Sequence, residues 1–334
     1  SLLVPIVPHQ EPRLGLSLRQ RASNLLERVR TTLGSVPDII HVFGGGGAKL
    51  ASETARLSRA VPAFELWRPN LETTARLTIN RALGPILPEQ DRSTRRTALL
   101  TVPSETISQR AAQHFPDAVV RVIRWGVHVA RELDTTRTDA VCMLLIGPGR
   151  DTRAWQSAFL AALQVMSGNK RFHLFADADV TRKLRVWKHA RAAGVLDRLS
   201  LIDEAEARRD VVLRADVLLY SDARGESRSI LLDAMASRVT IIAAADPLAD
   251  MLIDGRTARL VADTTTSQWR EAIEHVVNEP TTRDRLTESA AEYVLKHHRA
   301  TRQIVSLIDA YEWVAGDPVR IGPDDAPVLG QSGV

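Results

Sequence analysis

The segment that decides the fold is ADVLLYSDARGESRSILLDAMASRVTIIAAADPLADMLIDGRTARLV, residues 215–261. Its apolar run Ala215–Tyr220 predicts a buried strand, followed by an acidic loop, a short helix and a strand at Val239–Ala244. A strand that leads through a loop into a helix often forms a ligand site, because free N–H groups and the dipole at a helix N-terminus attract phosphate. Acidic residues beside that site, here Glu226 and Asp233, are suited to bind sugar or ribose hydroxyls. The segment therefore predicts a nucleotide-sugar site.

The same alternation of strands and helices continues along the chain. Continuous apolar runs such as Ala140–Ile146 are typical of strands that are buried on both faces of a parallel sheet. Strands joined by helices form right-handed parallel units, and 334 residues exceed one core of the usual size. We therefore expect an α/β protein with two doubly wound, Rossmann-like parallel-sheet domains. Amphipathic stretches predict helices at Ser17–Leu33, Ala48–Arg59, Trp155–Met166, Val180–Gly194, Trp269–Val277, Pro280–His298 and Thr301–Val314.

Composition narrows the class of protein. Apolar residues at 44% and charged residues at 25% are values of a globular chain, and no apolar run is long enough for a membrane-spanning helix. The single cysteine, Cys142, is expected in the buried core, so no disulfide is expected. The net charge of +4 favours an anionic acceptor or weak contact with an anionic membrane, although a solvated arginine-rich face explains it more simply. Aromatic residues, at 4%, do not interleave the basic runs, which argues against nucleic-acid binding.

Several motifs follow one another in the order and spacing of a known family. LLDAMASRVTIIA and IDGRTARLV resemble the donor-binding core of the retaining GT-B glycosyltransferases of family 4, also called glycosyl transferases group 1. The resemblance covers roughly residues 20–315 and is carried by the order of seven weak motifs, none of them exact. The motifs are PDIIHVFG (37–44), VPSETISQRAAQHF (102–115), RVIRWGVHV (121–129), CMLLIGPGRDTRAW (142–155), RFHLFADADVTRKLRVWKHARAAGVLDRLSLID (171–203), and the two above at 231–243 and 253–261.

This resemblance implies a GT-B architecture, in which two Rossmann-like domains face each other across a cleft. We expect an acceptor domain at 1–125, incomplete at its start because nothing corresponds to the family's first strand and glycine-rich loop. A nucleotide-sugar donor domain is expected at 126–300. A C-terminal helix at 301–316 is expected to cross back, followed by a disordered tail at 317–334. The protein is expected to be cytoplasmic, at most peripheral to the inner face of the membrane.

The implied activity is transfer of a sugar from a UDP-, GDP- or ADP-linked donor to a glycan, lipid or small-molecule acceptor. The family implies retention of anomeric configuration, with no metal and no other cofactor. Arg150, with Arg153 as a second candidate, would neutralise the leaving diphosphate. Glu226, the expected catalytic residue, would hold the hydroxyls of the donor sugar, and Asp233 would hold the ribose. Donor-binding positions further include Gly147, Gly149, Gly225 and Ser227, and the acceptor side includes His41, Gly44, Gly45 and Gly46.

Departures from the family pattern keep a second hypothesis open. The two acidic residues, Glu226 and Asp233, have six residues between them where the family has seven. The family's second basic residue falls near Trp155, and its active-site histidine falls near residues 67–68. These changes favour a catalytically silent binding or scaffold relative as the alternative. A metal-binding D-x-D at Asp177–Asp179 and another two-domain Rossmann enzyme, such as a sugar-nucleotide epimerase, remain lesser alternatives.

Overall fold

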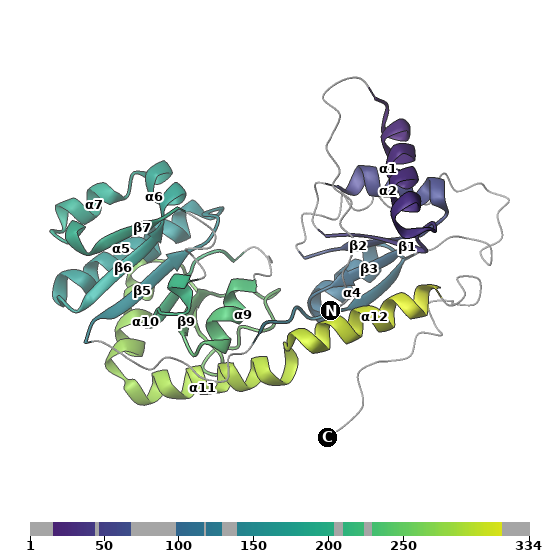
Figure 1. The fold of residues 1–334 in the computed structure, drawn as a ribbon. Coiled ribbons are helices and arrows are strands. Elements are labelled where there is room, and N and C mark those ends of the chain that lie inside the picture. Colours follow the sequence, from purple (N-terminus) through teal and green to yellow (C-terminus); the bar gives the residue numbers. More distant parts are fainter. Residues whose placement is uncertain are drawn as a thin grey trace. The chain divides into compact units, whose positions relative to one another are not determined.

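Two compact units make up the chain in the computed structural model (Figure 1). One unit comprises Ser1–Ile123 together with Ile304–Val334, and the other comprises Arg124–Gln303. The last helix, α12 (Ala300–Ala315), therefore begins in the second unit and belongs to the first from Ile304 onward. The structure describes residues 16–43, 47–67, 98–116, 118–128, 139–203, 210–223 and 229–315.

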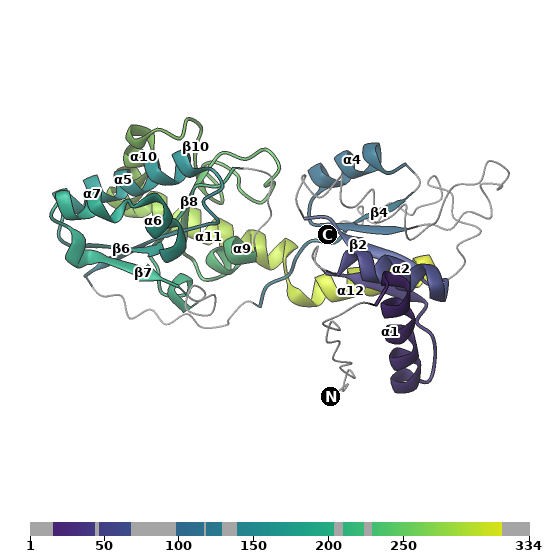
Figure 2. The same ribbon diagram turned by 90° about the horizontal axis from the view of Figure 1, so that it is seen from above.

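The first unit contains a four-stranded parallel sheet in the order β1-β2-β3-β4. Alternate side chains of its strands enter two separate apolar clusters. Helices α2 (Ala48–Ser58) and α4 (Glu105–His114) contribute to one of these clusters and α12 contributes to the other, so they cover opposite faces of the sheet. Figure 2 shows α2, α4 and α12 around the strands of this unit. The sheet is thus covered on both sides, as a doubly wound fold requires. The strands are β1 (Ile39–Val42), β2 (Val61–Glu65), β3 (Leu99–Val102) and β4 (Val119–Val122).

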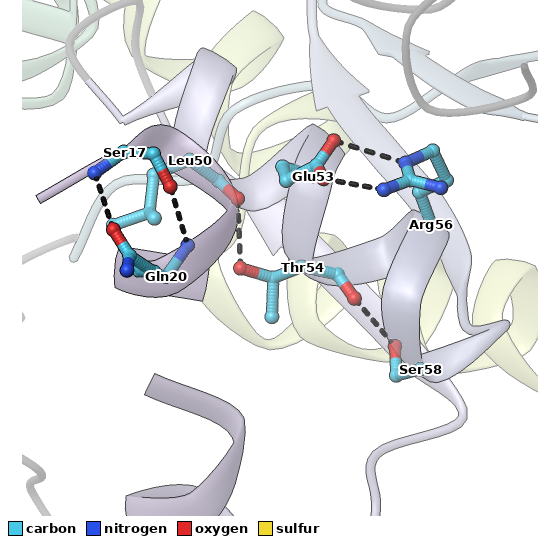
Figure 3. A network of polar contacts seen from close by, with 7 residues as sticks. All are labelled: Ser17, Gln20, Leu50, Glu53, Thr54, Arg56 and Ser58. Carbon is cyan, nitrogen blue, oxygen red and sulfur yellow. Dashed lines mark hydrogen bonds and ion pairs between the residues drawn. The ribbon is translucent and has the colours of Figure 1, made fainter. Parts of the chain in front are cut away.

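Polar contacts fix the ends and turns of the first two helices (Figure 3). Helix α1 (Leu18–Leu33) begins with a capping box, in which Ser17 Oγ accepts from Gln20 N at 3.3 Å and Gln20 Oε1 accepts from Ser17 N at 2.9 Å. In α2, the carboxylate of Glu53 is buried and accepts from Nε of Arg56 at 3.0 Å. The helix start at Ser17 agrees with the sequence prediction.

The second unit contains a six-stranded parallel sheet in the order β10-β9-β8-β5-β6-β7. Residues alternate between two apolar clusters, so that Leu145 of β5 faces α5 (Thr152–Gly168) and α10 (Thr266–Asn278). Leu144 instead faces α9 (Ser229–Ala236) and α11 (Pro280–His297). Together with the first sheet, this confirms the predicted α/β class with two doubly wound parallel-sheet domains. The strands are β5 (Val141–Ile146), β6 (Phe172–Asp177), β7 (Leu199–Ile202), β8 (Val217–Tyr220), β9 (Thr240–Ala244) and β10 (Arg259–Val261).

Two local predictions in this unit are wrong. The single helix expected at Val180–Gly194 is two helices, α6 (Ala178–Leu184) and α7 (Trp187–Ala192), because Arg185 between them has a left-handed backbone with φ 54°. Cys142 is half-buried and not fully enclosed. Burial and the neighbouring Asp216 nevertheless raise the pKa of its thiol, which disfavours the reactive thiolate. In the described part of the chain, no helix is long and apolar enough to cross a membrane.

The segment that enters the second unit is joined to the junction of α11 and α12. Val127 N donates to the carbonyl of His298 at 2.8 Å, and Gly126 N donates to Oε1 of Gln303 at 2.8 Å. A Cβ on Gly126 would lie 2.4 Å from Cα of Ala300, so only glycine allows this approach. Nδ1 of His298 lies 2.8 Å from the Trp125 carbonyl, and burial lowers the pKa of this histidine to about 4.

Candidate functional site

The strand order of the second unit contains one topological switch point, between β5 and β8. From β5 the chain builds outward through β6 and β7, and it then returns to the other side of β5 with β8 and β9. Open α/β sheets bind ligands at such a point, beyond the carboxyl ends of the two strands. The loop after β5 runs from Gly147 to Asp151, and the loop after β8 begins at Ser221. The sequence motif and the topology therefore locate the same candidate site.

Two glycines of the loop after β5 occupy conformations that other residues rarely adopt. Gly147 has φ 146° and Gly149 has φ 58°. A Cβ at Gly149 would lie 2.6 Å from Cγ1 of Val180, and a Cβ at Gly147 would lie 2.5 Å from Oδ2 of Asp222. Both positions therefore require glycine, for backbone shape and for space. The donor-binding role expected of these two glycines stays a prediction.

The loop leads directly into α5, and Asp151 caps this helix. Its Oδ1 accepts from Ala154 N at 3.0 Å, which satisfies one of the free donors at the helix start. Arg150, just before the cap, and Arg153, in the first turn, both have exposed side chains. Two guanidinium groups thus lie at the positive end of a helix of 17 residues, an arrangement that favours phosphate.

Asp222, from the loop after β8, is the residue that the sequence analysis missed. Its Oδ1 accepts from Arg150 N at 3.0 Å and from Asp151 N at 3.3 Å, and its Oδ2 accepts from Gly149 N at 3.3 Å. The residue is only 4% exposed. One signal in the sequence could have found it. Asp222 lies two positions after the apolar strand β8, which pairs with β5, and β5 is followed by the glycine-rich loop. Its carboxylate fastens the two switch-point loops to each other.

The family's second basic position, near Trp155, lies in the core. The Trp155 side chain is completely buried and stacks on Phe159 with ring centroids 5.5 Å apart. No cation at that position could reach a ligand without rebuilding the core, which leaves Arg153 as the nearest basic side chain along α5. The chain therefore departs from the family pattern at this position in its structure as well as in its sequence.

The acidic residues of the deciding segment are only partly described. Asp233 lies in the middle of α9 and is half-buried, while its neighbours on both sides are enclosed in the core. Glu226, Gly225 and Ser227 lie outside the described residues, so the roles proposed for these three stay predictions. Of the predicted site residues in this segment, the structure therefore places only Asp233, on the helix that follows β8.

His41, the predicted acceptor-side histidine, lies under α12 in the first unit. Its Nδ1 and the Tyr311 hydroxyl are hydrogen-bonded at 2.5 Å, and its ring lies 4.2 Å from that of Phe43. Burial lowers the pKa of His41 to about 4, and burial with nearby Glu65 raises the pKa of Tyr311 to about 12. Both groups are therefore neutral at pH 7. Gly44, Gly45 and Gly46 lie outside the described residues.

The D-x-D alternative has a structural explanation. Asp177 is 3% exposed and caps α6, with its Oδ1 accepting from Val180 N at 3.3 Å, whereas Asp179 is exposed. The two carboxylates therefore differ in surroundings, and the first already has a role at the helix start. Among the described residues, no cluster of three potential metal ligands occurs. Asp177 thus caps α6, and Asp179 lies on the surface.

Comparison with known proteins gives structural relatives but no close sequence relative. No protein-family profile and no curated protein matches the chain. Among solved structures, HepE from Anabaena in complex with UDP and glucose is similar with a TM-score of 0.69 at 13% identity, over 90% of this chain and 84% of that one. A glycosyltransferase from Rickettsia africae is similar with a TM-score of 0.65 at 10% identity, over 92% of this chain and 84% of that one.

A third structural relative extends the same result. Sucrose-phosphate synthase from Thermosynechococcus elongatus is similar with a TM-score of 0.64 at 13% identity, over 90% of this chain and 79% of that one. Identities this low carry the fold and not the activity. The chain has the GT-B fold, with two Rossmann-like parallel-sheet domains, that these glycosyltransferases share.

Proposed function

We propose that the chain transfers a sugar from a nucleotide-diphosphate sugar to an acceptor, with the donor bound at the switch point between β5 and β8. The observation that carries this proposal is the pair of exposed guanidinium groups at the start of α5, one from the loop Gly147–Asp151 and one from the first turn of the helix, within a GT-B fold. The structural relatives that were crystallised with UDP and with UDP-glucose support a nucleotide-sugar ligand. The nucleotide of the donor is UDP, GDP or ADP, and the acceptor is a glycan, a lipid or a small molecule.

In this proposal, the protein's main chemical task is to stabilise the leaving diphosphate. Charge accumulates on the diphosphate as the bond to the sugar breaks, and cations held next to that charge stabilise it. Arg150 and Arg153 supply these cations at the start of α5. Glu226 would hold the sugar hydroxyls and Asp233 the ribose. The positions of Gly225 and Ser227 would contribute backbone donors.

We further propose that transfer retains the anomeric configuration and needs no metal. Both points rest on the resemblance of the sequence motifs to the family. The arginine side chains would then do the electrostatic work that a divalent cation does in other nucleotide-sugar enzymes.

The test is release of nucleoside diphosphate from UDP-, GDP- and ADP-glucose, with and without EDTA, for wild type and Arg150→Ala. Arg270→Ala is the matched control, because Arg270 is an exposed arginine on α10. The proposal predicts release from one donor, insensitivity to EDTA, at least a tenfold loss in Arg150→Ala and no loss in the control. Release that disappears with EDTA would refute the metal-free mechanism. Equal activity of the two variants would refute the proposed site.

A catalytically silent relative is the second candidate, and one observation favours it. Trp155 is buried where the family pattern places its second basic residue, so the diphosphate site has one cation fewer on that side of α5. A silent relative would bind one nucleotide and release no product from any donor. No release from any donor in that assay, together with binding of one nucleotide in calorimetry, would select this candidate.

A further inference from the structure

The loop that should receive the donor's phosphates already holds an anion. Three successive backbone N–H groups, of Gly149, Arg150 and Asp151, converge on the carboxylate of Asp222 at 3.0–3.3 Å. Successive N–H groups that point to one place form an anion-binding nest, of the kind that cradles phosphate in other proteins. In this loop the carboxylate is buried and comes from the adjacent strand's loop. The protein therefore supplies its own substitute for a phosphate group.

We propose that Asp222 limits the affinity of this site for phosphate. Its carboxylate occupies the N–H groups of the loop, so that a diphosphate is held by the Arg150 and Arg153 side chains alone. This inference rests on the proposed function and names the residue that limits the affinity of the same site. Asp222 restrains nucleoside-diphosphate binding, and its neutralisation tightens that binding.

The structure of the loop supports a permanent place for the carboxylate. Gly147 leaves room for it, since a Cβ there would lie 2.5 Å from Oδ2 of Asp222. The two carboxylate oxygens divide the donors between them, with two N–H groups on Oδ1 and one on Oδ2. Hydrogen bonds to an ionised acceptor are the strong ones, and a donor that is already satisfied in this way has little left for a ligand. A phosphate would first have to displace Asp222.

The charges around the loop after β5 lead to the same conclusion. The loop after β5 and the first turn of α5 carry two guanidinium groups, on Arg150 and Arg153, and the carboxylate of Asp151, while Asp222 adds a second carboxylate from the loop after β8. Asp151 is committed to the helix cap, and Asp222 neutralises the positive end of the same helix. An incoming diphosphate therefore meets balanced charge at the loop. Attraction is left to the exposed arginine side chains, which hold a phosphate less rigidly than backbone donors.

Two variants separate this role from simple structural support. In Asp222→Asn, one oxygen remains for the N–H groups of Arg150 and Asp151, and the N–H of Gly149 is released. In Asp222→Ser, the side chain is too short to hold the nest, and all three N–H groups become available. The inference predicts tighter binding of inorganic pyrophosphate and of the cognate nucleoside diphosphate in the order Ser, Asn, wild type, with about a tenfold gain for Ser.

Asp151→Asn is the matched control. It removes one negative charge at the same site, while asparagine keeps the helix cap at Ala154. If the nest is what matters, Asp151→Asn changes affinity by no more than about threefold, since only a screened charge is lost. Equal gains in Asp151→Asn and Asp222→Ser would reduce the effect to net charge and overturn the inference.

The outcomes keep this inference apart from the proposed function. If nucleotides bind to no variant but pyrophosphate binding tightens in Asp222→Ser, the inference stands and the nucleotide-sugar proposal is refuted. If wild type binds a nucleotide and a folded Asp222→Ser binds it equally or more weakly, the inference is overturned and the proposal stands. Circular dichroism and thermal unfolding of each variant establish that it is folded.

Hydrogen exchange on wild type decides the matter if the Asp222 variants fail to fold. The amides of Gly149, Arg150 and Asp151 are expected to be protected without any ligand, because the carboxylate already binds them. Saturating pyrophosphate is expected to leave their protection unchanged. Fast exchange of these amides without ligand, with protection appearing only on addition of pyrophosphate, would show that the nest is open and would overturn the inference.

Discussion

Gly147→Ala is the substitution that tests the geometry of the switch-point loop most severely. The residue has φ 146°, a conformation that L-residues rarely adopt, and the added methyl group would lie 2.5 Å from Oδ2 of Asp222. Alanine therefore strains the backbone and pushes away the carboxylate that holds the loop. The change leaves charge and hydrogen-bonding groups untouched, so any effect comes from shape.

The magnitude follows from these two contributions. Forcing alanine into this backbone conformation costs about 1–3 kcal/mol. Displacement of Asp222 weakens at least its hydrogen bond to Gly149 N, and a bond to a charged acceptor is worth about 1.5–3 kcal/mol. We expect a loss of at least about 2.5 kcal/mol in the unfolding free energy of the second unit. For a domain of this size, a loss of about 2.5 kcal/mol lowers the melting temperature by roughly 5–10 °C.

Thermal unfolding followed by tryptophan fluorescence is a suitable assay, because Trp155 and Trp269 are fully buried in the second unit. Gly168→Ala is the control, since Gly168 ends α5 and no atom lies within 4 Å of a Cβ there. This control is expected to be neutral or stabilising by up to about 1 kcal/mol. If Gly147→Ala melts within 2 °C of wild type, roughly the effect of a contribution below 1 kcal/mol, the described loop geometry is wrong.

Three further predictions concern other parts of the chain. Gly126→Ala, whose methyl group would overlap the backbone at the start of α12, should lower the unfolding free energy by about 2–4 kcal/mol in urea unfolding, through loss of up to three hydrogen bonds. His41 and His298 have pKa values of about 4, below the unfolded value of 6.5, so their contribution to stability is complete above pH 6.5 and is lost as the pH falls towards 4, by at most about 1.4 kcal/mol per pH unit each. His298→Asn should flatten the dependence measured by urea unfolding between pH 7 and 5, and an unchanged slope would contradict the assignment. Asp177→Ala should lower stability by about 1 kcal/mol through loss of the α6 cap and leave nucleotide affinity unchanged with or without Mn²⁺; a Mn²⁺-dependent loss of affinity would restore the metal hypothesis.

The sequence predicts the fold well because apolar runs and amphipathic periodicity are local signals. The apolar run at 140–146 and the amphipathic stretch at 17–33 coincide with strand β5 and helix α1. The break between α6 and α7 could not be predicted, because it depends on a left-handed backbone at Arg185, where the sequence has neither glycine nor proline.

The site is less accessible to sequence reasoning than the fold. Gly147 and Gly149 could be named as loop residues from their place after an apolar strand, and the structure gives each a steric reason. Asp222 could not be named with the same ease, because its partners lie more than 70 positions away and meet it only through the pairing of β5 with β8. Pairing of strands that are distant along the chain is a property of the topology, which the motif around Asp222 does not encode.

The central claim is that the switch point between β5 and β8 binds a nucleotide without a metal. The most direct measurement is calorimetry of UDP, GDP and ADP in the presence of EDTA, with wild type and Arg150→Ala. The account predicts micromolar binding of one of the three nucleotides that is insensitive to EDTA and lost in the variant. Absence of binding by all three, or binding that Arg150→Ala leaves unchanged, would contradict it.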